Sequence, residues 1–177
     1  KVLDLNREKA VRTEVENRLT KFSPKLVVLN GHGSENMVTG HKNEPLIIAG
    51  DNEHLLKDKI VYAISCRSAK NLGLKSVSAG AINYSGYDDD FVFIYEPENF
   101  SRPLSDNTAK MFLEHSQIHV ESLIKGNTVN EALKRSKQNL KDNFVKALSE
   151  NNMGAVRFLW WDLKHFVSHG KTDARLE

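Results

Sequence analysis

The sequence lacks the residue patterns that disulfide-rich, membrane-spanning and nucleic-acid-binding proteins need. Its single cysteine, Cys66, excludes an internal disulfide and a multi-cysteine zinc site. No apolar run approaches the roughly 20 residues that a membrane-spanning helix requires. Its 25 Lys and Arg residues barely outnumber its 23 Asp and Glu residues, and the net charge is +2. Because nucleic-acid binders usually carry a strong basic excess, we expect no nucleic acid as partner. Because no segment is apolar enough to span a bilayer, we expect no membrane as partner either.

The remaining composition is that of an ordinary globular protein. The chain has 177 residues, of which 40% are hydrophobic and 27% charged, enough for one well-buried core. We therefore predict a single domain over residues 1–177. The chain begins at Lys1 without a visible signal peptide, so we expect a domain or processed fragment of a longer protein. A reducing cytoplasm is the default location for a chain without disulfides.

Short apolar runs predict the strands. Residues 25–30 and 59–65 show the continuous apolar pattern of strands buried on both faces. A helix is predicted to start from a cap at Asn6 and to end at Ser23 before Pro24, because apolar residues recur at helical spacing from Val11 to Phe22. Residues 31–45 are predicted to form a polar loop. Weaker strand candidates are residues 1–5, 46–49, 76–84 and 91–95.

The second half of the chain is predicted to be helical. Ser105 or Asp106 can cap a first helix, and Gly126 stands where a residue just beyond its end should be. Thr128 and Glu131 have the spacing of a capping box, which predicts the start of a second helix. Strands separated by helices predict an α/β fold with a mostly parallel sheet and helices on both faces.

Two of the predicted strands end at residues that can do chemistry. Residues 25–30 lead into His32, and residues 59–65 lead into Cys66. The carboxyl ends of parallel strands meet at one edge of a sheet, so the imidazole and the thiol are expected side by side. A thiol has a reference pKa of about 8.5, and a nearby imidazole raises its thiolate fraction and protonates the leaving amine.

The residues around this pair suit a cysteine nucleophile. Gly31 and Gly33 flank the histidine and allow close approach of a ligand to the backbone. A helix predicted over residues 66–72 would stabilise a thiolate with its N-terminus. The amides of Gly33 and Cys66 are candidates for an oxyanion hole.

These two segments resemble the caspase-fold cysteine peptidases of clan CD, which include caspases, gingipains, clostripain, separases and CHAT domains. The matching blocks are LVVLNGHGS at residues 26–34 and KIVYAISCRSAKNLG at residues 59–73. The spacing after the cysteine is most similar to CHAT-type members. The resemblance continues through the helix pair around residues 123–140 and the closing segment 166–176, where Lys171 replaces a frequent aspartate.

The resemblance implies a three-layer caspase-like sandwich and a protein or peptide as substrate. It implies His32 and Cys66 as the catalytic dyad of an endopeptidase. It also implies that the first strand of the family, and any regulatory domains, lie outside this chain. No cofactor is required in such enzymes, although some relatives use calcium.

An acidic run after the third predicted strand points to substrate specificity. In this clan, the corresponding region helps to form the pocket for the side chain before the cleaved bond. A carboxylate of Asp88, the first choice, or of Asp89 would favour Arg or Lys there. Ser65, next to the cysteine, is also expected to contact substrate. Since Ile64 and Ser65 replace the Gln-Ala of caspases, no caspase-like preference for aspartate is expected.

Other functions are weighed against this one. The chain could be a catalytically silent caspase-like interaction module, or a flavodoxin-like domain that binds a small ligand at the same strand ends. His115 and His119 have the spacing of metal ligands on a helix, but no third ligand is evident. We therefore predict no metal site and place both histidines on a solvated helix face.

Overall fold

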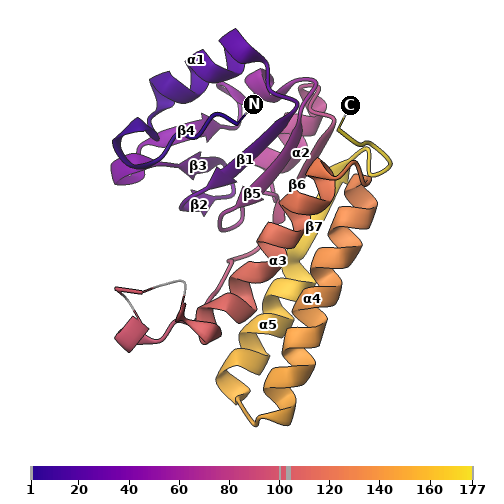
Figure 1. Ribbon diagram of the computed structural model, residues 1–177. Coiled ribbons are helices and arrows are strands. Elements are labelled where there is room, and N and C mark those ends of the chain that lie inside the picture. The colour runs from indigo at the N-terminus through magenta and orange to yellow at the C-terminus, as the bar shows by residue number, and fades with distance from the viewer. Residues whose placement is uncertain (1, 100, 103–104, 177) are drawn as a thin grey trace.

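A computed structural model describes residues 2–99, 101–102 and 105–176. The chain alternates helices and strands before ending in three long helices and a last strand (Figure 1). The helices are α1 (Arg12–Phe22), α2 (Leu72–Ser78), α3 (Asn107–Ile124), α4 (Val129–Ser149) and α5 (Met153–His165). The strands are β1 (Leu26–Asn30), β2 (Gly33–Ser34), β3 (Met37–Thr39), β4 (Pro45–Ile48), β5 (Ile60–Ile64), β6 (Asn83–Tyr87) and β7 (Phe166–Gly170).

The main sheet has the strand order β1-β5-β6-β7. β1, β5 and β6 are parallel, and β7 pairs antiparallel with β6. The predicted α/β class and mostly parallel sheet are therefore confirmed. The register pairs Asn30 with Ile64, so β1 and β5 end at the same level. This pairing fixes where the two segments after these strands lie.

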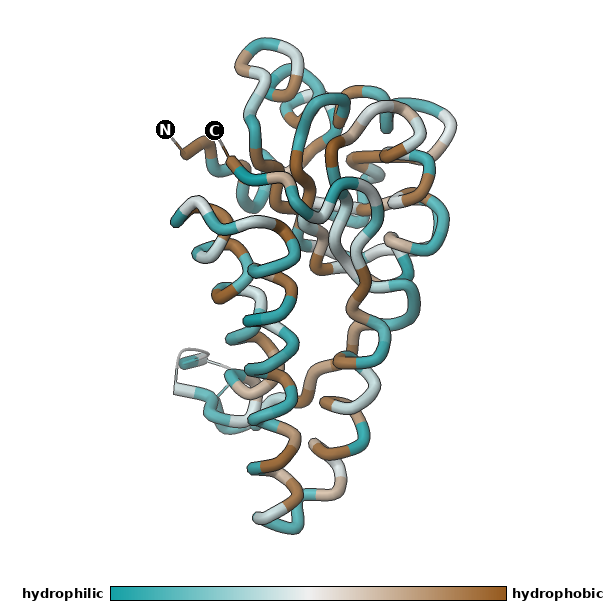
Figure 2. Tube along the Cα trace, turned by 90° about the vertical axis from the view of Figure 1, so that its right-hand side faces the viewer, coloured by the Kyte–Doolittle hydropathy of each residue, from teal (hydrophilic) through white to brown (hydrophobic). Residues whose placement is uncertain are grey.

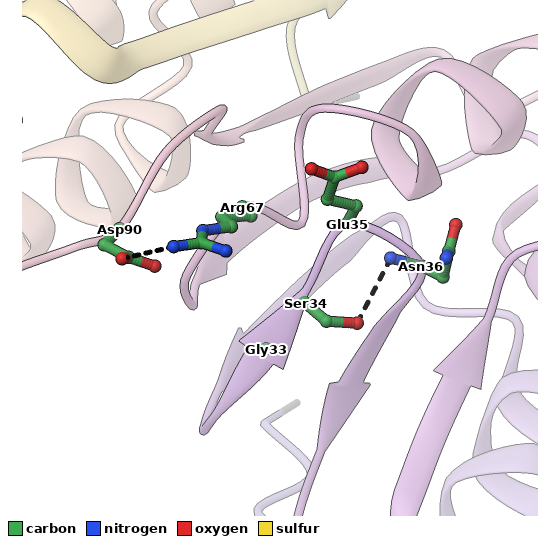
Figure 3. A pocket seen from close by; sticks show the side chains of 6 residues that line it. All are labelled: Gly33, Ser34, Glu35, Asn36, Arg67 and Asp90. Atoms are coloured by element: carbon green, nitrogen blue, oxygen red, sulfur yellow. Dashed lines mark hydrogen bonds and ion pairs between the residues drawn. The ribbon is translucent and has the colours of Figure 1, made fainter.

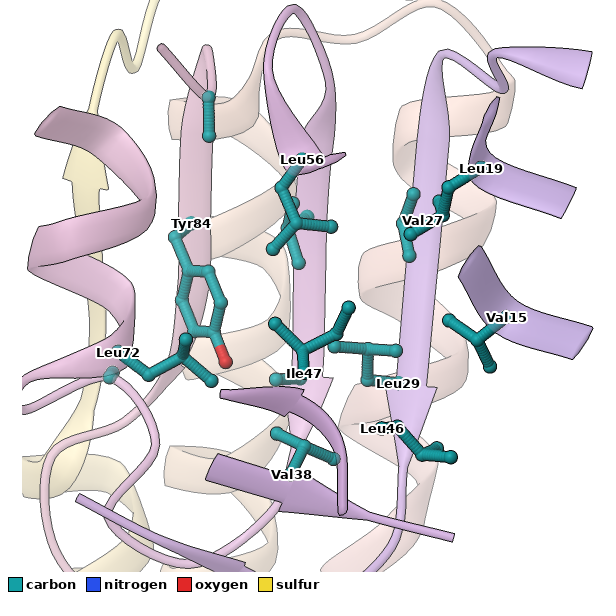
Figure 4. Packing of buried hydrophobic residues seen from close by; sticks show 14 residues of the cluster. Val15, Leu19, Val27, Leu29, Val38, Leu46, Ile47, Leu56, Leu72 and Tyr84 are labelled. Atoms are coloured by element: carbon teal, nitrogen blue, oxygen red, sulfur yellow. The ribbon is translucent and has the colours of Figure 1, made fainter. Parts of the chain in front are cut away.

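Helices pack on each face of this sheet. On one face, α1, α2 and β4 enclose an apolar cluster that includes Leu19, Leu72 and Tyr84 (Figure 4). On the other face, α3, α4 and α5 pack over Tyr62 and Phe166. These three helices project beyond the carboxyl edge of the parallel strands (Figure 1). Hydrophobic and hydrophilic stretches alternate along them, as amphipathic packing requires (Figure 2).

The predicted polar loop over residues 31–45 is wrong, because much of it belongs to a small antiparallel sheet. β2 pairs with β3, and β3 pairs with β4. Val38 and Ile47 are fully buried and join the cluster beneath them. The strand predicted over residues 46–49 is confirmed as β4, whereas β2 and β3 have only two and three residues, too few alternating positions to be visible in a sequence pattern.

Three other strand expectations need correction. Residues 76–84 divide between the end of α2 and the start of β6, which runs to Tyr87. The hydroxyl of Ser76 donates to the Leu72 carbonyl at 2.7 Å, a bond within the helix. Residues 91–95 and residues 2–5 form no strand, and Lys1 lies outside the described residues. The apolar side chains at these places are not buried in the sheet: Val2, Phe93 and Tyr95 are exposed.

Burial differs between the two strands that were expected to be covered on both faces. The first four residues of β5 are buried, which confirms the prediction for this strand. β1 alternates between buried and exposed residues, and Val28 is 43% exposed. In the described sheet β1 is an edge strand. The helix α3 packs over Tyr62 on the neighbouring strand β5. The prediction of two buried faces is therefore wrong for β1.

The local signals for the ends of α3 and α4 are confirmed, whereas the predicted Asn6 cap is wrong, because α1 begins at Arg12 with Val11 at its cap. Asp106 caps α3 by accepting from the Ala109 N–H at 2.8 Å. Thr128 and Glu131 form the predicted reciprocal capping box of α4. Gly126 has a φ of +83°, the left-handed conformation that favours glycine after a helix. No helix in the described part of the chain combines the length and apolarity needed to cross a membrane.

The solvated face predicted for two histidines of α3 is wrong. His115 and His119 are both fully buried against the sheet. The Tyr87 hydroxyl bonds to the His115 ring, and the His119 ring lies 4.5 Å from that of Tyr62. The spacing placed both histidines on one helix face, but only the packing showed that this face meets the sheet.

Candidate active site

The segments that follow β1 and β5 are in direct contact. Gly31 N–H donates to the Ile64 carbonyl at 3.3 Å, which continues the pairing of the two strands. A Cβ atom on Gly33 would lie 2.6 Å from the Cys66 carbonyl oxygen and 2.8 Å from Ser65 Cβ. Only glycine fits at this contact, since no real Cβ atom approaches backbone so closely. The structure thus brings Gly33, Ser65 and Cys66 together, as the sequence predicted.

His32 lies beside this contact with an exposed side chain. Its carbonyl accepts two hydrogen bonds from Thr39, from the N–H at 2.8 Å and from the hydroxyl at 3.3 Å. The small sheet therefore fixes the histidine backbone through β3. No hydrogen bond joins its imidazole to Cys66 within the part of the chain that the structure describes.

Cys66 is half-buried and its Sγ lies 3.7 Å from the carbonyl oxygen of Phe91. Burial raises the pKa of the Cys66 thiol, and the nearby Asp90 carboxylate raises it further. The thiol is therefore protonated at neutral pH in this conformation. The N–H of Cys66 donates to no acceptor among the described residues, so it is free to bind a ligand.

The helix predicted to begin at Cys66 is absent. Residues 66–71 form turns, and α2 begins at Leu72. Arg67 has a φ of +59°, which a helix cannot accommodate. Its N–H donates to the Asp89 carbonyl at 3.0 Å, so the turn is bonded to the segment after β6 instead. The helix N-terminus that was expected to stabilise a thiolate is not at the cysteine.

The acidic run divides between two surroundings. Asp88 turns toward α5, and its Oδ1 lies 2.8 Å from His165 Nδ1. Asp89 and Asp90 face the cysteine turn, where Arg67 approaches them at 3.7 Å and 2.7 Å. The structure thus brings Asp89 to the site and leaves Asp88 in a contact with the helix behind it.

A cavity of about 360 Å³ opens beside Gly33 and the turn that follows Cys66 (Figure 3). It is lined by Gly33, Ser34, Glu35, Asn36, Arg67 and Asp90. Ser65 does not line it, because its buried hydroxyl donates to the Ser68 hydroxyl at 2.8 Å. Ser65 is buried next to Gly33, one of the lining residues.

Sequence reasoning missed several residues that surround this cavity. Glu35 pairs with Lys70 at 2.6 Å, and Arg67 pairs with Asp90 at 2.7 Å. With Asp89 nearby, three carboxylates and two cations surround the cavity, which leaves an excess of negative charge. The available signal was their position: Glu35 directly follows the first matched block, Arg67 and Lys70 lie within the second, and Asp90 belongs to the acidic run.

Among the described residues, no group of three or more His, Cys, Asp or Glu side chains is placed to hold a metal ion. Comparisons of the chain with protein-family models, curated proteins and solved structures found no match.

Proposed function

We propose that this protein is a cysteine endopeptidase of caspase-like, three-layer architecture. The contact of Gly33 with the Ser65 side chain and the Cys66 carbonyl carries the proposal. The strand register also supports it, because His32 and Cys66 each follow by two residues the paired positions Asn30 and Ile64. Helices on both faces of the mostly parallel sheet also support this architecture.

In the proposed reaction, the Cys66 thiol attacks the carbonyl carbon of the scissile peptide bond. His32 accepts the thiol proton and donates it to the nitrogen of the departing amine. The free N–H of Cys66 and that of Gly33 donate to the oxyanion. The resulting thioester is hydrolysed by water, which releases the acyl product and restores the thiol. Catalytic hydrogen bonds are often absent without substrate, so an exposed His32 is compatible with this role.

The charges around the cavity support cleavage after Arg or Lys. Asp90 lines the cavity and carries a carboxylate that already binds a guanidinium, that of Arg67. A basic substrate side chain would replace Arg67 in this contact. Asp89 adds negative charge, whereas the carboxylate of Asp88 is held by His165. We therefore assign the main role in specificity to Asp90 rather than to Asp88.

The experiment that tests the function is a panel of fluorogenic peptides with Arg, Lys, Asp, Asn or Leu before the scissile bond. The wild-type protein should hydrolyse the Arg and Lys peptides. Cys66→Ala and His32→Ala should abolish hydrolysis while circular dichroism shows an unchanged fold. Turnover close to that of the wild type in either folded variant would disprove the dyad.

Two observations favour a second function, a caspase-like module that acts only by binding other proteins. The raised thiol pKa and the missing hydrogen bond to His32 describe a site without an activated nucleophile. A thiol-reactive peptide probe separates the two functions. A peptidase should be labelled at Cys66 faster by a probe with Arg next to its reactive group than by one with Leu, whereas a silent module should not discriminate.

A further inference from the structure

Residues 88–92 form one wall of the cysteine site. Their inner side bonds to the turn that carries the nucleophile. Arg67 N–H donates to the Asp89 carbonyl at 3.0 Å, and Cys66 Sγ lies 3.7 Å from the Phe91 carbonyl. The Phe91 ring packs 4.7 Å from that of Tyr87, at the end of β6. Any force that moves this segment must therefore change the surroundings of the thiol.

The outer side of the same segment is held by consecutive side chains of α5. The indole Nε1–H of Trp161 donates to the Asp90 carbonyl at 3.0 Å. Oδ1 of Asp162 accepts from the Val92 N–H at 3.0 Å. These two bonds fix the backbone immediately before and after Phe91, the residue whose carbonyl meets the thiol.

A third anchor lies one helical turn further along α5. His165 binds the Asp88 carboxylate through Nδ1 at 2.8 Å, and its carbonyl accepts from the Asp88 N–H at 3.1 Å. The rings of Trp161 and His165 are 4.3 Å apart, so the two anchors support each other. The helix thus binds the segment at residues 88, 90 and 92.

We propose that Trp161 and Asp162 are positioning residues, which hold the backbone of residues 90–92 so that Phe91 covers the Cys66 thiol and Asp90 reaches the cavity. The effect on the thiol follows from geometry alone, whereas the effect on substrate rests on the proposed peptidase function. Neither side chain touches the reacting atoms. Both act through the segment that they hold.

The chemistry of Asp162 fits such a role. Its side chain is fully buried, and Oδ2 has no hydrogen-bond partner among the described residues. Burial raises the pKa of Asp162 to about 8, so the group is a neutral acid at pH 7. Asparagine is also neutral and keeps an oxygen at the Oδ1 position, whereas alanine removes the acceptor. Asp162→Asn is therefore the conservative variant and Asp162→Ala the disruptive one.

The neighbouring tryptophan supplies a matched control. Trp160 is 50% exposed, and its ring lies near the Lys164 ammonium on the outer face of α5. Trp161→Phe removes the indole N–H that binds the Asp90 carbonyl but keeps an aromatic ring. Trp160→Phe makes the same chemical change where no such bond to residues 88–92 exists among the described contacts.

The first test is the rate at which iodoacetamide alkylates the protein. Cys66 is the only cysteine, so the rate reports on this thiol alone and requires no peptidase activity. Losing one anchoring hydrogen bond should uncover the thiol and raise the rate about tenfold in Asp162→Ala and Trp161→Phe. Asp162→Asn and Trp160→Phe should react like the wild type. The pH midpoint of alkylation should fall in the two disruptive variants, because a less buried thiol ionises more readily.

Wild-type alkylation rates in folded Trp161→Phe would overturn the proposal, as would equal acceleration by Trp160→Phe. If Asp162→Ala does not fold, the alkylation rate of Trp161→Phe alone tests the proposal. The second test is the peptide panel, where Trp161→Phe should raise KM for the Arg peptide more than it lowers kcat. The expected alkylation pattern in a protein that cleaves no peptide would support the positioning roles and disprove the peptidase. Peptide cleavage with unresponsive alkylation would disprove the positioning roles alone.

Discussion

Acid should destabilise this protein less than its two buried histidines alone would, because the buried Asp162 gains stability over the same fall in pH. Burial lowers the pKa of His115 to about 3 and that of His119 to about 4, from an ordinary value of 6.5. Burial also raises the pKa of Asp162 from 3.8 to about 8. All three groups are buried, the two histidines on α3 and Asp162 on α5, and both helices pack on the same face of the sheet.

The sign of each effect follows from where the proton binds more tightly. A histidine with a lowered pKa stabilises the fold above pH 6.5, and this stability is lost as the pH falls toward the folded-state pKa. From pH 7 to pH 5, each histidine should lower the free energy of unfolding by about 2 kcal/mol. The carboxyl of Asp162 binds its proton more tightly when folded, so stability is lost as the pH rises from 3.8 to 8. From pH 7 to pH 5, Asp162 should therefore raise the free energy of unfolding by roughly 2–3 kcal/mol.

The perturbation that separates these effects is Asp162→Asn, studied by urea unfolding at pH 7 and pH 5. From pH 7 to pH 5, the free energy of unfolding should fall by only about 1 kcal/mol in the wild type and by about 4 kcal/mol in the variant. His119→Phe removes one titrating ring and with it about 2 kcal/mol of acid destabilisation, so the wild-type loss should become a gain of about 1 kcal/mol in the free energy of unfolding at pH 5. His54→Gln, at an exposed histidine, is the control and should behave like the wild type. Equal acid sensitivity of the wild type and Asp162→Asn would refute the opposing role of the aspartate.

Three further outcomes follow from the structure. Arg67→Ala should lower KM for Arg and Lys peptides several-fold, since the guanidinium competes for Asp90, and an unchanged KM would count against that cavity as the specificity site. Gly33→Ala should destabilise the fold by roughly 1–3 kcal/mol in urea unfolding, the cost of overpacking against the Cys66 carbonyl, and a neutral result would contradict the contact. Amides of β7 should exchange slowly with deuterium because they pair with β6, and rapid exchange there would show that β7 is not held in the sheet.

The sequence alone determined the features that depend on a few neighbouring residues. Asp106 and the pair of Thr128 and Glu131 were correctly predicted to cap helices, because capping acts over three or four positions. The adjacency of the segments around His32 and Cys66 was also predictable. Two apolar runs of strand length at crossover spacing must pair in parallel to bury their backbone, which brings their ends together.

Only the tertiary structure decided which side chains meet at that edge. Arg67 with Asp90, and α5 with residues 88–92, join positions more than 20 residues apart, and no local pattern encodes such contacts. The same holds for the burial of His115, which depends on which elements cover that helix face. Hydrophobic periodicity predicts that one face of a helix is buried. Which element packs against that face depends on how several elements pack together. That packing determines the pKa of the thiol and the charge of the cavity, and hence the chemistry available to the site.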